Sequence, residues 1–521
     1  MPFVYPSIRV QFHLGSEAFD WRAFDSSAFD TMTTAGADLL ATGNVRVKYG
    51  IDGNGPTDGV ASTGELQYVL RNDARNSALL QGYYSPAHTN VRSGWTFGIP
   101  VRAVFTYNGT DYIKFTGKIR NILPDAGRYR TQRVQVTAYD VMRELAEADA
   151  REVTIQTNKA EDELLNALIA AMPSTAQPLA TDFDAGVDSY PYVFDKVAGD
   201  TKALAVARDI VVSSLGMLFC IGNGTLKYRS RHSLATTTSA VSLDDDDLDD
   251  LVVPSSLDGV YNRVRVTTHP KVISAAATDE LYTLPTGSSI EVGAGVTVEV
   301  WTAYTDPNDR QTNVGGSAVV TALVGGTHYA ANAAADGSGA NMTASITATL
   351  TPFASTAKWS FTNAASTAAF ITTQKVIGKA VRDPGPRTFE AYDVADYGDR
   401  PLVIDLPYQD DPYIGQSAAD YLVAQYSALS QQIESVTFLA NRSDALMVQA
   451  LTREPGDRIT LSETVTGVTS VQCIIQSVEL ELRPGPILIC KWGVRPANTI
   501  RFWQWGIAGA SEWGSTTIYA F

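Results

Sequence analysis

Residues 101–119 carry the most constraining pattern in the sequence, an alternation of side chains on either side of an Asn-Gly pair. Val101 and Ala103 alternate with Arg102 and Val104, and a second stretch of the same kind follows Asn108-Gly109. Asn and Gly both tolerate positive φ, which the tight turn of a β-hairpin requires. The pattern therefore predicts an antiparallel β-hairpin over these residues.

The segment FTGKIRNILPDAGRYRTQRVQVTAYDVMREL, residues 115–145, extends this hairpin with another strand and the start of a helix. Val134, Val136 and Ala138 alternate with polar residues, so one face of the strand should be buried and the other wet. Asp140 stands at the N-cap position of the apolar run that follows. With the alternating stretches that begin at Val45, these strands predict an all-β unit followed by a helix.

A second series of strands is predicted near the end of the chain. The stretches SVTFLANR, DRITLSE, VQCIIQSVELEL and PILICKWGV lie between residues 435 and 494, and turns are marked by Pro455-Gly456-Asp457 and Pro484-Gly485-Pro486. A helix is expected before them, over residues 415–429. Together they indicate a second domain that resembles a β-barrel.

Two regions of different character separate these β units. Residues 151–255 predict a small α+β domain, because helical spacing over residues 160–172 and 201–215 is followed by a hairpin at residues 222–224. Residues 275–378 are rich in Ala, Thr, Gly and Ser and contain short strands at the spacing of a β-sandwich. Trp301, Tyr304 and Trp359 favour a packed core there, so we expect an inserted immunoglobulin-like module.

The last residues, 501–521, hold three of the eight tryptophans, Trp503, Trp505 and Trp513. Such a short segment cannot bury them alone. We expect a C-terminal arm that packs on its own domain, a neighbouring copy or a partner.

The bulk properties bound the function classes. A chain of 521 residues is long enough for about three or four domains. Its net charge of −16 works against nonspecific binding of nucleic acid or of an anionic membrane. The N-terminus has no pattern of a secretory signal, and no stretch is long enough to span a bilayer, so we expect synthesis in a reducing cytoplasm.

No motif for catalysis, a cofactor or a metal stands out, and we predict no catalytic, cofactor-binding or metal-binding residues and no enzyme activity. The three cysteines lie in apolar runs and are expected to be buried thiols: Cys220, Cys473 and Cys490. The histidines are too far apart to present a pair to a metal on one helix: His13, His88, His232, His269 and His328. The acidic residues 244–250 and the loop of residues 52–59 lack the full calcium-loop pattern, and residues 244–250 are expected to form a solvated linker.

The order of these pieces resembles the minor tail proteins of tailed bacteriophages, of the baseplate hub and tail tip type. The resemblance rests on the following residues: Asn72 near the end of a strand, residues 98–102 (GIPVR), 115–119 (FTGKI), 136–140 (VTAYD), 397–400 (YGDR) and 455–459 (PGDRI). It extends over most of the chain apart from the Ala-Thr-rich insert.

The resemblance implies a mainly β fold with α+β parts and two β-barrel domains like those of a tail tube. The corresponding domains are residues 1–150, a first tube-like domain; 151–255, the α+β domain; 256–274 with 379–500, a second tube-like domain; 275–378, the inserted sandwich; and 501–521, the arm. A homotrimer would then show six similar β units to a hexameric tail tube, and neighbouring copies would cover open sheet edges.

The implied function is structural: a hub adaptor in the virion that joins the tail tube to trimeric distal tail components around the DNA channel. The implied partners are further copies of the chain, tail tube and distal tail proteins, the tape measure protein, and tail fibre or tip proteins, with DNA passing through without specific binding. Two alternatives stay open. One is a hexameric distal tail protein whose insert binds carbohydrate, and the other is a virion-associated glycan hydrolase.

Overall fold

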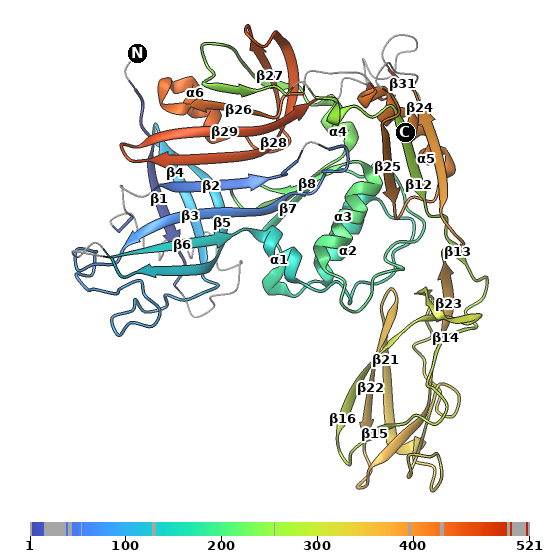
Figure 1. Ribbon diagram of the computed structural model, residues 1–521. Helices are drawn as coiled ribbons and strands as arrows, with labels where there is room; N and C mark the ends of the chain where they lie inside the picture. Colours follow the sequence, from blue (N-terminus) through green and yellow to red (C-terminus); the bar gives the residue numbers. More distant parts are fainter. Residues whose placement is uncertain are drawn as a thin grey trace.

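The computed structural model describes residues 3–14, 38–39, 44–53, 55–127, 132–254, 256–393, 398–427 and 432–497, together with the backbone of 501–502 and 517–518. The fold is mainly β, as predicted. A large sheet lies at one side of the body, helices and two small sheets lie beside it, and the insert projects away from the body (Figure 1).

The large sheet has 12 strands in the order β1-β4-β5-β6-β3-β2-β28-β29-β26-β11, with β27 beside β28 and β10 beside β27. The predicted hairpin is β4 with β5, and it turns at Asn108 and Gly109, both at positive φ. The bounds are β1 (Ser7–Phe12), β2 (Val45–Gly50), β3 (Ser62–Arg71), β4 (Pro100–Tyr107), β5 (Thr110–Asp125), β6 (Arg133–Tyr139), β10 (Ser239–Leu243), β11 (Asp250–Val252), β26 (Ser435–Leu439), β27 (Arg458–Glu463), β28 (Val468–Arg483) and β29 (Ile487–Pro496).

The strands of this sheet fall into two halves with the same spatial order. The first half runs β1-β4-β5-β6-β3-β2, and the second half runs β10-β27-β28-β29-β26-β11. Each half has a middle strand of 16 residues, β5 or β28. The halves differ at one end, because β1 is antiparallel to β4 whereas β10 is parallel to β27.

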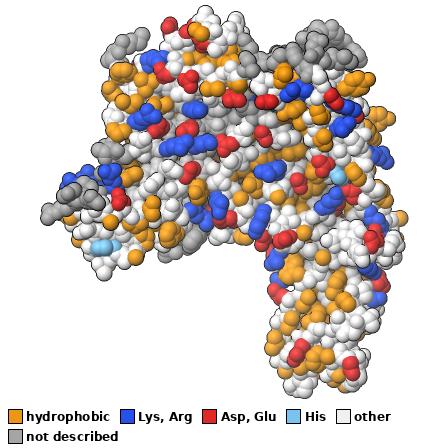
Figure 2. Space-filling model, viewed as in Figure 1, with side chains coloured by type: hydrophobic (Ala, Val, Ile, Leu, Met, Phe, Trp, Pro, Cys, Tyr) orange, Lys and Arg blue, Asp and Glu red, His pale blue; other side chains and the backbone are white. Residues whose placement is uncertain are grey.

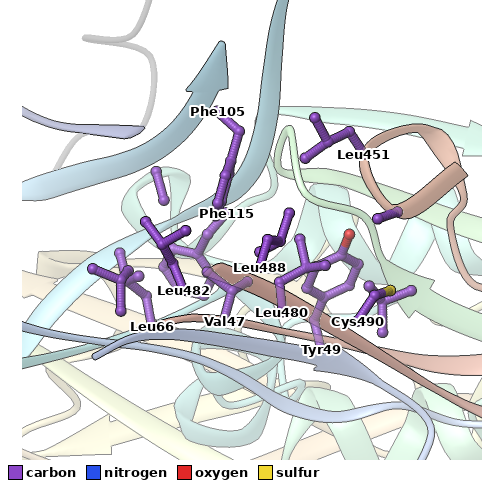
Figure 3. Close-up of a cluster of buried hydrophobic side chains, with 14 of the residues drawn as sticks. Val47, Tyr49, Leu66, Phe105, Phe115, Leu451, Leu480, Leu482, Leu488 and Cys490 are labelled. Atoms are coloured by element: carbon purple, nitrogen blue, oxygen red, sulfur yellow. The ribbon is translucent and has the colours of Figure 1, made fainter. Parts of the chain in front are cut away.

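Both halves are built over one hydrophobic core. Figure 3 shows buried side chains from both halves packed together, among them Val47, Tyr49, Leu66, Phe105, Phe115, Leu451, Leu480, Leu482, Leu488 and Cys490. The sequence predicted a separate barrel for each β unit. In the structure, the two units are instead joined edge to edge, because β2 at the border of the first unit pairs with β28 of the second.

The small domain packs α1 (Val141–Glu147), α2 (Glu161–Ala171), α3 (Ala203–Ser214) and α4 (Arg231–Thr236) with a sheet of β7 (Ala180–Phe183), β9 (Thr225–Arg229) and β8 (Met217–Cys220). A short 3-10 helix, η3 (Ser174–Ala176), lies between α2 and β7. Asp140 caps α1 as predicted, since its carboxylate accepts a hydrogen bond from the backbone N–H of Met142.

A third sheet has the order β24 (Arg387–Tyr392), β12 (Arg263–Thr268), β25 (Pro401–Leu406), and α5 (Pro412–Tyr426) covers one face. The predicted domain boundaries differ here. We placed residues 256–274 in the second β domain and residues 239–252 in the α+β domain, but β12 forms this separate sheet while β10 and β11 join the large one. Local periodicity shows that a strand exists and cannot show its distant partner.

Two of the described helices were not predicted, the short α4 and α6 (Asp444–Thr452), and α6 lies between the short turn η6 (Ala440–Arg442) and β27. Ser443 caps it by accepting a hydrogen bond from the N–H of Leu446. Its buried residues Leu446, Met447, Ala450 and Leu451 follow helical spacing, which was the signal that could have predicted it.

The insert contains two sheets that share one core, as a sandwich does. One sheet is β16 (Thr297–Ala303), β22 (Thr356–Asn363) and β21 (Ile346–Pro352), and the other gathers strands around the long β23 (Ala369–Arg382): β13 (Val272–Ile273), β14 (Asp279–Thr283), β15 (Ile290–Val292), β19 (Gly315–Ser317) and β20 (Tyr329–Asn332). Two short strands, β17 (Thr305–Asp306) and β18 (Asp309–Asn313), pair with each other. The immunoglobulin-like strand order stays a prediction.

The remaining short elements are η4 (Leu257–Gly259), η5 (Thr343–Ser345), β30 (Arg501–Phe502) and β31 (Thr517–Ile518). The three tryptophans of the predicted C-terminal arm, Trp503, Trp505 and Trp513, lie outside the described residues.

Candidate assembly face

The two halves meet at a seam between β2 and β28, which run antiparallel from Val45 opposite Leu482 to Gly50 opposite Ser477. Val45, Val47 and Tyr49 point into the shared core, and the residues between them point outward. The seam therefore buries apolar side chains on one face and leaves a continuous polar face on the other.

The middle strand β28 changes partner where it reaches the seam. Its first part pairs with β27, and its second part pairs with β2 on the same side. The register shifts between Ile475 and Ser477, where the carbonyl oxygen of Gln476 accepts a hydrogen bond of 2.8 Å from the N–H of Ile51. This bulge lets one strand hold two neighbours in succession.

Charged side chains of alternating sign cross the seam on its outer face. Glu65 on β3 lies opposite Lys48 on β2, Lys48 lies opposite Glu479 on β28, and Glu479 lies opposite Lys491 on β29. Arg46 also bonds Glu479, at 2.7 Å. Figure 2 shows basic and acidic side chains interspersed over this part of the surface. Opposite charges across strands stabilise the sheet by about 0.2–1 kcal/mol per pair, and they leave the face nearly neutral.

The GIPVR and PGDRI segments occupy corresponding places in the two halves. The N–H of Gly98 donates to the carbonyl oxygen of Ile119 at 2.7 Å, and the N–H of Gly456 donates to that of Ile475 at 2.8 Å. Both glycines have positive φ, 78° and 89°. Each therefore leads into the strand beside the middle strand of its half, β4 or β27, in a backbone conformation that favours Gly.

The FTGKI segment owes its pattern to close packing in the core. The aromatic ring of Phe115 lies over Gly117, where a Cβ would come within 2.7 Å of the ring and would overlap the carbonyl oxygen of Tyr139. Phe115 and Ile119 are both buried. A larger residue than Gly would displace the ring from the shared core.

The opposite face of β5 fastens the first half to the rest of the body through three polar side chains. The ammonium group of Lys114 donates to Glu454 at 2.7 Å, and the hydroxyl of Thr116 donates to the Gly222 carbonyl at 3.0 Å. Lys118 donates to the carbonyl oxygen of Thr175 at 2.7 Å. A buried ammonium is costly unless it is paired, so these contacts fix where the residues after α6, the turn after β8 and η3 can lie against β5.

The second half is fastened in the same manner by Arg458 of the PGDRI segment. Its guanidinium group donates to the carbonyl oxygens of Leu234 and Ala235 in the last turn of α4, at 2.7 and 3.1 Å. These carbonyls have no partner within the helix, so a buried cation satisfies them.

Asp140 connects the large sheet to α1 at a fully buried position. Its N–H donates to the carbonyl oxygen of Gly64 at 3.1 Å, and its carboxylate accepts from Met142 at 3.0 Å. Burial raises the pKa of Asp140 to about 7, although its backbone hydrogen bonds oppose the shift. A Cβ on Gly64 would lie 2.9 Å from the Cβ of Tyr49, so glycine allows the approach.

The insert is held at its neck by a cluster of charges. His269 lies between two carboxylates, with Nδ1 2.9 Å from Asp383 and Nε2 2.6 Å from Asp405. Lys271 bonds Asp195 of the small domain at 2.6 Å, and the two side chains are only 1% and 3% exposed. The insert also touches the small domain directly, where the N–H of Ala354 donates to the carbonyl oxygen of Val153 at 2.9 Å.

The residues singled out from the sequence are mostly structural. All three cysteines are buried and free, as predicted. His88 and His328 each accept a backbone N–H within a turn, whereas His269 lies in the neck cluster. Among the described residues, no group of His, Cys, Asp or Glu is placed to hold a metal ion, and no helix is long and apolar enough to cross a membrane.

The acidic run of residues 244–250 is solvated, as predicted, since five of its seven residues are exposed, but it is also held in place by hydrogen bonds. It joins β10 to β11 and is bonded to the second half of the sheet: Asp245 accepts from the N–H of Thr464 at 2.9 Å, and Asp249 pairs with Arg442. The carboxylates cap turns and strand ends that lie about 190 to 220 residues away in sequence, which composition alone does not show.

No family model matches the chain, and no curated protein matches its sequence. Its overall arrangement is similar to solved structures of tail proteins. The 43 kDa tail protein of prophage MuSo2 from Shewanella oneidensis is 10% identical, with 94% of this chain and 99% of that chain covered and a TM-score of 0.48. A tail protein from Neisseria meningitidis is 8% identical, with 95% and 97% covered and a TM-score of 0.48. The prophage tail protein gp18 from Listeria monocytogenes is 7% identical, with 93% and 94% covered and a TM-score of 0.41.

Identities this low carry no partner or activity from those proteins to this chain. All three solved structures are tail proteins, and two of them come from prophages.

Proposed function

We propose that this chain is a structural protein of a phage tail tip: a hub adaptor whose copies form a trimeric ring around the DNA channel. It would be made in the host cytoplasm and would reside in the virion. The observation that supports this most is the repeated strand order of the two halves, joined edge to edge at β2 and β28. A trimer of such chains contains six comparable β units, which matches the symmetry of a hexameric tube.

The outer face of the seam suits the wall of a channel through which DNA moves. Its charges alternate in sign across four strands, Glu65, Lys48, Glu479 and Lys491, and largely cancel. A polyanion is held by surfaces that neutralise many phosphates, and this face offers little net positive charge. DNA would pass without being bound.

The remaining partners follow from this position. One side of the ring would contact the tail tube and the tape measure protein, and the other would contact distal tail proteins and fibre or tip proteins. The insert would project outward as an appendage, because it stands away from the large sheet (Figure 1).

The alternative of a distal tail protein with a carbohydrate-binding insert gains no observation of its own. A distal tail protein with one tube-like unit does not account for the second half of the sheet. For a carbohydrate-binding insert, exposed aromatic side chains would be expected, but the exposed large apolar residues of 275–378, all of which are described, are Val296 and Val324. Trp301 is stacked between Phe353 and the guanidinium of Arg151.

The proposal is tested by the mass and symmetry of the purified protein. Native mass spectrometry should find three chains, and electron micrographs should show a ring with six similar densities around a central opening. A monomer at high concentration, or a hexamer with one sheet unit per chain facing the opening, would contradict it.

A further inference from the structure

The two halves correspond residue by residue. The middle strand of the second half has a neighbouring strand at one place where, among the described residues, the middle strand of the first half has none. Ile119 on β5 corresponds to Ile475 on β28. The N–H of Ile119 donates to the carbonyl oxygen of Ile99 at 3.0 Å, and the N–H of Ile475 donates to that of Asp457 at 2.9 Å. In both middle strands, the register shifts directly afterwards.

Beyond the shift, the two middle strands differ in their neighbours. On β28, the residues after Gln476 pair with β2 on the side where β27 lay before. On β5, the pairing with β4 ends at Lys118. Beyond Lys118, no strand within the described ranges pairs with β5 on that side. Residues 121 and 123–126 are exposed there, and Leu123 is 57% exposed. This edge of β5 is the counterpart of the seam.

The counterpart of β2 is β11, at the outer border of the second half. β2 lies beside β3, and β11 lies beside β26 in the corresponding place. In the described part of the chain, β11 pairs with β26 alone. The carbonyl oxygen of Val252 accepts from the N–H of Glu434 on the β26 side, so the backbone groups of Leu251 and Val253 point to the open side.

We propose that β11 of one copy pairs antiparallel with residues 123–126 of β5 in the next copy, and so repeats between chains the seam that β2 and β28 form within the chain. The proposal rests on the ring-forming function proposed above and names its interface. In this repeat, Val252 corresponds to Arg46 and Asp125 corresponds to Glu481. Because Arg46 lies opposite Glu481 in the seam, Val252 would lie opposite Asp125 of the neighbouring copy.

The backbone groups at this edge are compatible with such pairing. By the same register, Val253 would lie opposite Pro124 and could donate its N–H to the Pro124 carbonyl oxygen. Leu251 would lie opposite Ala126 and could exchange hydrogen bonds with it. Pro124 has no N–H to donate, and prolines on open edges hinder unspecific strand pairing, which a monomer awaiting assembly needs. The pairing would also cover Leu123 and Val252, exposed by 57% and 36% in a single chain.

Such an interface is heterologous, because it joins the border of the second half to the border of the first. Heterologous contacts form closed rings when the rotation between copies divides a full turn. Three copies would alternate three internal seams with three of the proposed ones. Each half would then have a strand neighbour at both of its seam positions.

Disulfide cross-linking of the full-length protein tests the pairing. Asp125→Cys combined with Val252→Cys places two thiols at a non-hydrogen-bonded pair, where the Cα atoms lie about 4.5 Å apart, within the range for a disulfide. The native cysteines are buried and should not compete. We expect mild oxidation to give covalent dimers and trimers that reduction reverses. Asp125→Cys combined with Ser7→Cys, on the other open edge at β1, is the matched control and should give none.

Charge variants provide a second readout that needs no oxidation. Val252→Asp would face Asp125 and should weaken trimer formation roughly two- to fivefold, and adding Asp125→Lys should restore it, since like charges across strands repel and opposite charges attract. If trimers form but residues 125 and 252 do not cross-link, and the charge variants do not change trimer formation, the interface is wrong while the hub function stays intact. A protein that stays monomeric would overturn the hub function as well.

Discussion

Gly50 lies directly opposite Ser477 at the end of the seam, and the backbones approach so closely there that no side chain fits at Gly50. Its φ is 113°, in the region that favours glycine. A Cβ would lie 2.7 Å from the Cα of Ser477 and would overlap the carbonyl oxygen of Gln476, which accepts the N–H of Ile51. The pairing at this end of the seam therefore requires glycine, which has no side chain.

The first prediction is that Gly50→Ala loosens the seam. The substitution combines an unfavourable φ with a backbone clash, so we expect a loss of about 2 kcal/mol or more in unfolding free energy. Gly467→Ala is the matched control: Gly467 also has a positive φ, 74°, but a Cβ there meets no atom within 4 Å. Its loss should stay near 1 kcal/mol. Urea unfolding followed by tryptophan fluorescence compares the two, and equal losses would contradict the close approach.

The second prediction concerns Asp140 and pH. Its pKa is raised from 3.8 to about 7 by burial, so the folded chain keeps a proton that the unfolded chain releases. This group therefore favours the folded state most below pH 4, and that contribution is lost as the pH rises from about 4 to 7, at about 1.4 kcal/mol per unit of pKa difference. Asp140→Asn retains an N-cap acceptor and cannot ionise.

Relative to the native protein, Asp140→Asn should gain stability as the pH is raised from 4 to 8. The measurement is the difference in unfolding free energy between the two proteins at each pH, which removes the contribution of other titrating groups. A flat difference for Asp140→Asn would mean that the buried carboxylate titrates normally.

The sequence predicted elements better than it predicted their partners. The hairpin around Asn108, the strand that begins at Arg133 and the cap at Asp140 follow from local alternation and turn chemistry, and all are found. The pairing of Val45 with Leu482 spans most of the chain and has no local signal. The same limit explains why two separate barrels were predicted where one sheet covers one core.

Motif residues showed a similar division. Gly98, Gly117 and Gly456 belong to the segments that resemble phage tail proteins. The structure supplies a physical reason for each glycine, a positive φ or a close approach. The neck cluster was not predicted, because His269, Asp383 and Asp405 are far apart in sequence. The partners of the acidic residues 244–250 were not predicted either, because Thr464 and Arg442 are far from them in sequence.

The third prediction concerns the buried ion pair at the neck of the insert. Lys271→Met would leave the carboxylate of Asp195 buried without its cation, and removal of one partner of a buried pair costs about 3–5 kcal/mol. We expect the insert to detach from the small domain, seen as new cleavage by a protease between residues 268 and 275 and near 383. Lys271→Met combined with Asp195→Asn removes both charges and should recover most of the loss. Equal sensitivity of the single and double variants would show that the charge pair does not hold the neck.

The last prediction is that the insert can be excised without loss of assembly. Ser274 and Ala380 are joined by a backbone hydrogen bond of 3.2 Å, at the end of the ribbon formed by β13 and β23. Replacing residues 275–379 with Asn-Gly would close that ribbon with a two-residue turn. The insert has its own core, so the cores of the large sheet and of the third sheet keep their side chains, whereas the small domain loses the contact of Ala354 with Val153. We expect a modest loss of stability and an unchanged trimer, measured by light scattering after size exclusion. Monomers from the excised protein would place the insert inside the ring interface, and the outward appendage proposed for it would then be wrong.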